Sequence, residues 1–234
     1  MANLPVQRSS SKDIAAFLHK AARTPTLAQV KGRLIFAVDA TMSRQPTWDA
    51  ATEIQGDMFE VAQSIGGLGV QLVYFRGRGE FEASEWTTTP SALAMRMRNV
   101  RTRSGFTQLR RVLHHAAEEA RRTKVSALVY VGDCFEEDPE VVAKEAGALA
   151  LLGVPAFMFH EADDPNAASM FHEVARLTHG VYLRFDSGAA KQLRDLLKAA
   201  AVYAAGGGSA LNRFAELTGG EALRLARSIG TKAE

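Results

Sequence analysis

Short apolar runs alternate with longer amphipathic stretches along most of this chain. Strands are predicted where the runs have few polar positions, at 34–38, 70–75, 125–131, 154–159 and 181–185. Helices are predicted where apolar residues recur every three or four positions, at 48–65, 90–99, 109–122, 139–151, 165–178 and 189–204. This alternation predicts a doubly wound α/β fold, in which helices cover both faces of a mainly parallel sheet.

One further segment has the pattern of an edge strand. Glycines at 77 and 79 indicate a turn, and in residues 80–87 apolar and polar side chains then alternate. Alternation of this kind is typical of a half-buried strand. The segment therefore predicts a hairpin at an edge of the sheet, which brings the sheet to six strands.

The two ends of the chain have their own patterns. Ser10 and Asp13 have the spacing of a capping box before a short amphipathic helix, which Pro25 ends. The last part of the chain is interrupted by Gly206-Gly207-Gly208. The pattern that follows predicts a final helix over 210–228, either continuous or split at Gly219-Gly220. We expect three units: an N-terminal helix and linker over 1–31, a domain over 32–205 and a C-terminal helix over 206–234.

Composition excludes several classes of protein. With 234 residues, 47% hydrophobic and 23% charged, the chain is long and apolar enough for one sizeable folded domain. A net charge of +2 is too balanced to indicate nucleic acid or an anionic membrane, and one cysteine excludes an internal disulfide and a thiolate-rich zinc site. Because no apolar run is long enough for a membrane span or a signal peptide, we expect a cytoplasmic protein.

Oxygen-bearing side chains follow two predicted strands and precede one predicted helix. Asp39, Thr41 and Ser43 alternate after the first strand, Thr107 precedes the helix at 109, and Asp133 follows the strand at 125–131. In an open parallel sheet, ligands bind beyond the carboxyl ends of the strands. Hard divalent ions such as Mg²⁺ or Mn²⁺ prefer such ligands, and an ion held by only two carboxylates attracts a further acidic oxygen.

In this combination and order, the five residues resemble the metal-ion-dependent adhesion site of von Willebrand factor type A (VWA) domains. That site uses an Asp-x-Ser-x-Ser loop, a distant Thr and a distant Asp, and the resemblance covers residues 32–204. It implies a doubly wound sheet with one short antiparallel edge strand. It also implies a non-enzymatic module that binds a partner's Asp or Glu through the cation. Intracellular bacterial relatives often work beside an AAA+ ATPase or another assembly, which makes such an assembly a candidate partner.

Three positions depart from the family's pattern. Thr41 replaces the commoner Ser and retains the hydroxyl, Phe106 stands where a small residue usually precedes the Thr, and Cys134 stands where Gly usually follows the Asp. The two larger side chains can reshape the loops. A carboxylate beside Cys134 raises the pKa of its thiol, which favours an incidental cysteine over a nucleophile.

Other interpretations of the same residues stay open. Asp39 and Thr107 can be ordinary caps of turns and helices. A magnesium-dependent phosphohydrolase with Asp39 as nucleophile is the enzymatic alternative, although Thr41 stands where haloacid-dehalogenase-like enzymes place a second Asp. A third possibility is a scaffold with a vestigial metal site that acts through its terminal helices.

The remaining polar residues give weaker signals. We expect His160 to lie in a solvated loop, or alternatively at the rim of the binding site. We expect His114 and His115 to lie at the surface or to be hydrogen-bonded. The arginines between 96 and 111 predict either a solvated face or a basic rim that attracts an acidic partner. Nucleic acid is disfavoured there because aromatic residues do not alternate with the arginines.

Overall fold

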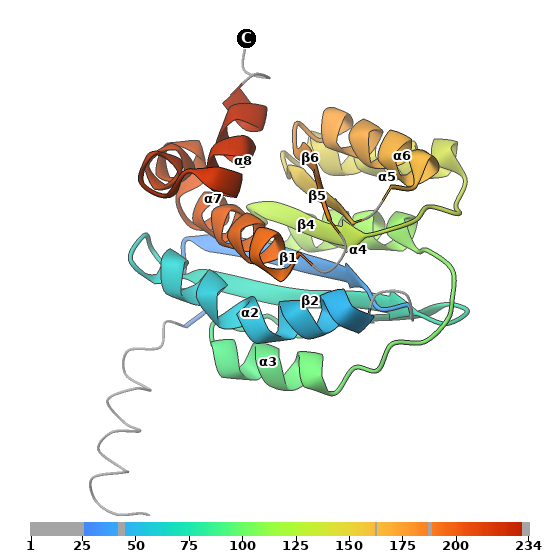
Figure 1. Cartoon of the computed structure of the whole chain (residues 1–234), viewed down its shortest axis with the longest axis horizontal. Coiled ribbons are helices and arrows are strands. Elements are labelled where there is room, and N and C mark those ends of the chain that lie inside the picture. The colour runs from blue at the N-terminus through green and yellow to red at the C-terminus, as the bar shows by residue number, and fades with distance from the viewer. Residues whose placement is uncertain (1–25, 42–44, 162, 187–188, 231–234) are drawn as a thin grey trace, which may run out of the picture.

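The computed structural model describes residues 26–41, 45–161, 163–186 and 189–230. Within these ranges one sheet has the strand order β3-β2-β1-β4-β5-β6 (Figure 1). The strands are β1 (Gly32–Asp39), β2 (Leu68–Arg76), β3 (Glu80–Ala83), β4 (Ala127–Gly132), β5 (Ala156–Glu161) and β6 (Val181–Phe185). Neighbouring strands pair in parallel, except for the antiparallel pair of β2 and β3. The predicted fold class, a six-stranded and mainly parallel sheet with one antiparallel edge strand, is confirmed.

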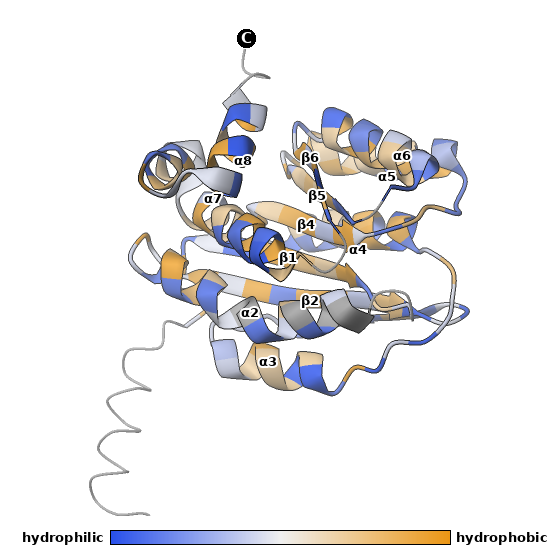
Figure 2. Ribbon diagram, viewed as in Figure 1, coloured by the Kyte–Doolittle hydropathy of each residue, from blue (hydrophilic) through white to orange (hydrophobic). Residues whose placement is uncertain are grey.

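Helices cover both faces of the sheet. One layer contains α2 (Gln45–Gln63), α3 (Pro90–Arg98), α7 (Ala190–Thr218) and α8 (Gly220–Gly230), and the other contains α4 (Leu109–Arg122), α5 (Pro139–Leu151) and α6 (Pro165–Leu177). In β1, Phe36 and Val38 pack into the first layer, and Ile35 and Ala37 pack into the second. Because successive strand side chains point to opposite faces, burial of both faces requires the continuous apolar run seen in the sequence (Figure 2).

The edge hairpin is shorter than predicted. Strand β3 ends at Ala83. Beyond it, the N–H of Ser84 donates to the carbonyl of Leu72 at 2.8 Å, and an isolated antiparallel bridge joins Val70 and Thr87. Between these points the indole N–H of Trp86 donates to Glu119 Oε2 at 2.7 Å. Side-chain hydrogen bonds thus supplement a shorter ladder than the alternating pattern predicted.

The predicted break at Gly206-Gly207-Gly208 is a kink within a longer helix. Gly207 has φ 71° and ψ −169° inside α7, a conformation that glycine adopts without the steric cost of a Cβ. The optional break at Gly219-Gly220 is present, since α7 ends at Thr218 and α8 begins at Gly220.

The helices beyond the kink join the main core. Leu211 in the second half of α7 and Leu225 in α8 are buried in the same apolar cluster as Phe36 of β1. The assignment of 206–234 as a separate unit stays a prediction. The predicted N-terminal helix lies outside the described residues. Within them, none of the helices combines the length and the apolar content that a bilayer crossing needs.

Candidate metal centre

The strand order places a topological switch point between β1 and β4. The chain runs from β1 to β2 on one side and from β4 to β5 on the other, so the connections at their carboxyl ends diverge. In doubly wound sheets, ligands bind at such a switch point. Asp39 is the last residue of β1, and Asp133 directly follows β4. The sheet therefore brings two of the predicted site residues to neighbouring strand ends.

Asp39 begins a tightly held turn. Its side chain is fully buried, and its Oδ1 accepts a hydrogen bond of 2.8 Å from the backbone N–H of Thr41, which is also buried. The residue between them, Ala40, donates to the carbonyl of Phe75 in β2 and accepts from the N–H of Arg103, each at 3.0 Å. These bonds fix the loop against its neighbours on both sides. Ser43, the third predicted ligand of this loop, lies outside the described residues.

Asp133 contributes a second carboxylate to the same place. One oxygen of Asp133, one oxygen of Asp39 and Sγ of Cys134 all lie within 4.8 Å of one another. Oδ1 of Asp133 is shielded from solvent and has no hydrogen-bond partner among the described residues. Buried polar atoms are usually hydrogen-bonded, so an orphaned carboxylate oxygen calls for a positive partner. The pair offers the carboxylate oxygens that a hard divalent cation prefers.

Thr107 contacts the loop that carries Asp133. Its side chain is buried, and its Oγ1 accepts a hydrogen bond of 3.1 Å from the N–H of Glu136. The N–H of Thr107 donates to Glu136 Oε2 at 3.4 Å. Thr107 therefore contacts the loop after β4 at Glu136, which lies three residues after Asp133. Its place as a ligand stays a prediction.

The interpretation of Thr107 as an ordinary helix cap is wrong. Helix α4 begins at Leu109, and Gln108 at the N-cap position makes no side-chain cap bond. The carboxylate of Glu137 instead accepts from the N–H groups of Leu109 at 2.5 Å and Arg110 at 3.0 Å. Burial raises the pKa of Glu137, against the opposing effect of these hydrogen bonds. No local pattern could have identified this cap, because it comes from 28 residues away.

Comparison with known proteins identifies the fold. No known family model matches the sequence, and no curated protein matches it either. Among solved structures, the SpRpn10 VWA domain matches with a TM-score of 0.56 at 11% identity, over 70% of this chain and 95% of that one. The chain has the von Willebrand factor type A fold. The fold expected from the resemblance is thus confirmed.

Two longer proteins contain a similar unit. The pilus adhesin SpaC from Lactobacillus rhamnosus GG has a TM-score of 0.57 at 11% identity, over 74% of this chain and 30% of that one. Proximal thread matrix protein 1 from the mussel byssus, whose structure has a zinc-occupied MIDAS motif, has a TM-score of 0.53 at 16% identity, over 74% and 46%. At these identities the likeness establishes the VWA fold alone, so the metal site rests on geometry.

The two bulky departures from the VWA pattern have different surroundings. Phe106 is 60% exposed and projects beside Thr107, so it does not fill the loop interior. Cys134 is half-buried, and burial together with the carboxylates of Asp133 and Asp39 raises the pKa of its thiol far above the usual range. A thiol that stays protonated is a poor nucleophile, and soft sulfur is a poor ligand for hard ions such as Mg²⁺. The oxygen atoms therefore define the chemistry of this centre.

The interpretation of His160 as a solvated loop residue is wrong. His160 lies within β5 and is fully buried, with Nδ1 at 2.9 Å from the Tyr182 hydroxyl and Nε2 at 3.3 Å from the carbonyl of Asp133. Burial lowers the pKa of the imidazole, which favours its neutral form. The ring thus ties the Asp133 loop of the VWA sheet to β5 and β6. The apolar run before it was the only available signal, since β5 extends two residues beyond the predicted strand end.

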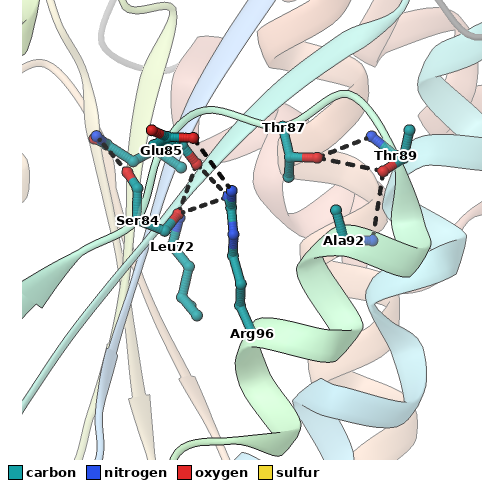
Figure 3. Close-up of polar contacts among 8 residues, drawn as sticks. Leu72, Ser84, Glu85, Thr87, Thr89, Ala92 and Arg96 are labelled. Carbon is teal, nitrogen blue, oxygen red and sulfur yellow. Dashed lines mark hydrogen bonds and ion pairs between the residues drawn. The ribbon is translucent and has the colours of Figure 1, made fainter.

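The basic stretch before Thr107 has a structural part and an exposed part. Arg96 of α3 donates to Ser84 Oγ at 3.2 Å and to the carbonyl of Glu85, which ties α3 to the chain beyond β3 (Figure 3). Arg103 pairs with Glu80, and its side chain remains 69% exposed. Arg101 is also exposed. Arg96 is thus held by hydrogen bonds within the fold, whereas Arg101 and Arg103 are exposed, as a solvated face requires. The basic rim stays a prediction.

Proposed function

We propose that this chain is a metal-dependent protein-interaction module. Asp39, Thr41, Ser43, Thr107 and Asp133 hold one Mg²⁺ or Mn²⁺ ion at the carboxyl edge of the sheet. An Asp or Glu of a partner protein completes the coordination. The module itself is not an enzyme, and an AAA+ ATPase or another cytoplasmic assembly is the expected partner.

The orphaned oxygen of Asp133 carries this proposal. It lies in a buried position close to a second carboxylate and has no hydrogen-bond partner among the described residues. Without a cation, two neighbouring negative charges repel each other in a region of reduced dielectric. A divalent ion satisfies both oxygens at once. Since such ions take about six oxygen ligands, the five proposed side chains leave one position for an external carboxylate.

Calorimetric titration of chelator-stripped protein with Mg²⁺ and Mn²⁺ tests the site directly. We expect one binding event in the wild type and at least a tenfold weaker one in Asp133→Ala, because a carboxylate ligand is lost. Asp186→Ala is the matched control, since Asp186 is an exposed aspartate after β6. Absence of binding in the wild type, or equal binding in Asp133→Ala that circular dichroism shows to be folded, would contradict the proposal.

A capture experiment tests the partner. Immobilised protein in Mg²⁺ should retain a partner that EDTA releases and that Asp133→Ala fails to retain. A partner that Asp133→Ala still binds, but that is lost on removal of residues 206–234, would support the scaffold alternative. Turnover of generic phosphoesters in Mg²⁺, lost in Asp39→Asn, would show an enzyme instead.

A further inference from the structure

A cavity of about 660 Å³ opens beside the candidate metal centre, between the loop after β4 and helices α5 and α6. We name it the acidic pocket. Its apolar lining residues are Phe135, Pro139, Ala143 and Met170, and its acidic ones are Glu136, Glu137, Glu140 and Glu173. Its volume falls within the range of sites that bury a small ligand or a few residues of a peptide.

The charge of the acidic pocket has one sign. No lysine or arginine is among its lining residues. Three of the glutamates are partly committed: Glu136 accepts from Thr107, Glu137 caps α4, and Glu173 pairs with Arg176 at 2.6 Å. Glu140 is exposed in the first turn of α5, and within the described residues its carboxylate makes no ion pair or hydrogen bond. The pocket therefore combines apolar lining residues with one carboxylate that makes no such contact.

We infer that the acidic pocket binds an arginine side chain of the partner protein. A guanidinium group has a flat face that packs on an aromatic ring such as Phe135, and its edge donates two parallel hydrogen bonds to a carboxylate such as that of Glu140. The aliphatic part of the same side chain packs against Met170. An ammonium group is a compact, strongly hydrated charge without such a face, which favours arginine over lysine.

The pocket and the metal centre share one loop. Phe135 is two residues beyond Asp133, and Glu136 exchanges two hydrogen bonds with Thr107. A partner segment with an acidic residue and an arginine a few positions apart would therefore contact both sites. This pairing rests on the proposed function, whereas arginine binding by the pocket needs no metal ion.

The blocked tripeptide acetyl-Gly-Arg-Gly-amide is the probe, titrated in EDTA and followed by ¹H–¹⁵N correlation spectra of the full chain. Its neutral isostere with citrulline and its lysine analogue are the matched peptides. We expect saturable shifts confined to the pocket, and binding by Glu140→Gln about two- to fivefold weaker, the value of one exposed ion pair. Ala143→Arg, which places a guanidinium inside the pocket, should abolish the shifts. Glu60→Gln removes an exposed charge from α2 and should change nothing.

The outcomes separate the two proposals. Arginine binding that persists in EDTA while calorimetry shows no metal site would support the pocket and contradict the proposed function. Equal binding of the citrulline or lysine peptide would overturn the assignment of arginine. Shifts outside the pocket, or unchanged shifts in folded Ala143→Arg, would overturn the assignment of the site.

Discussion

Replacing Asp133 with asparagine should stabilise the metal-free protein and reduce the stability that Mg²⁺ adds. The substitution preserves the shape of the side chain and removes one of two carboxylates whose oxygens lie within 4.8 Å. For two unit charges at 4.8 Å, Coulomb's law gives a repulsion of about 3.5 kcal/mol at an effective dielectric constant of about 20, and about 1 kcal/mol in water. Asp39 is fully buried and Asp133 half-buried, so the value lies between these limits.

In EDTA, Asp133→Asn should therefore raise the free energy of unfolding by about 1–3 kcal/mol, which corresponds to about 3–10 °C in Tm for a chain of this size. In Mg²⁺ at about a hundred times the wild-type Kd, the wild type should gain about 2.7 kcal/mol, and the variant, whose site is at least tenfold weaker, should gain about 1.4 kcal/mol or less. Differential scanning calorimetry of the wild type and the variant, each in EDTA and in Mg²⁺, measures the four stabilities.

Asp186→Asn is the matched control, because it removes an exposed carboxylate and should leave Tm and its response to Mg²⁺ unchanged. A lower Tm for Asp133→Asn in EDTA would refute the assumed repulsion. Equal gains from Mg²⁺ in the wild type and the variant would refute the role of Asp133 as a ligand.

Three further changes test local features of the fold. Glu137→Ala removes both cap bonds of α4 and should cost about 1–2 kcal/mol in urea unfolding. Gly207→Ala forces a Cβ into positive φ and should cost about 1 kcal/mol, whereas Gly208→Ala, at a helical position with open space around it, should stabilise by about 0.5–1 kcal/mol. Burial lowers the pKa of His115 below 6.5, so its contribution to stability is complete above about pH 6.5 and declines as the pH falls towards the folded-state pKa. His115→Gln should therefore lose less stability than the wild type between pH 7 and pH 5.

Each of these changes has an outcome that would contradict its reasoning. A stability loss below about 0.3 kcal/mol in Glu137→Ala would show that water replaces the cap. Equal effects at Gly207 and Gly208 would show that the kink does not depend on backbone conformation. If the pH dependence of stability is unchanged in His115→Gln, other groups cause the loss of stability at low pH. His160 is one of them, because burial also lowers its pKa.

Most errors of the sequence predictions concern residues whose partners are distant in the chain. The sequence predicts a loop at His160, because nothing next to this residue indicates its partners, Tyr182 and the carbonyl of Asp133, which are 22 and 27 residues away. The glycine run at 206–208 correctly marked an irregularity, but its continuation as a kinked helix depends on the packing of Leu211 and its neighbours in the core. Local patterns contain no record of such packing.

The order and type of the elements follow from periodicity, because a strand buried on both faces and a helix buried on one impose different spacings on apolar residues. Those spacings by themselves place Asp39 and Asp133 at strand ends. Only the folded chain decided that β1 and β4 are neighbours, and hence that the two carboxylates lie within 4.8 Å. The cap from Glu137 and the acidic pocket also exist only in three dimensions, since their residues come from separate elements whose approach is fixed by the packing of the whole core.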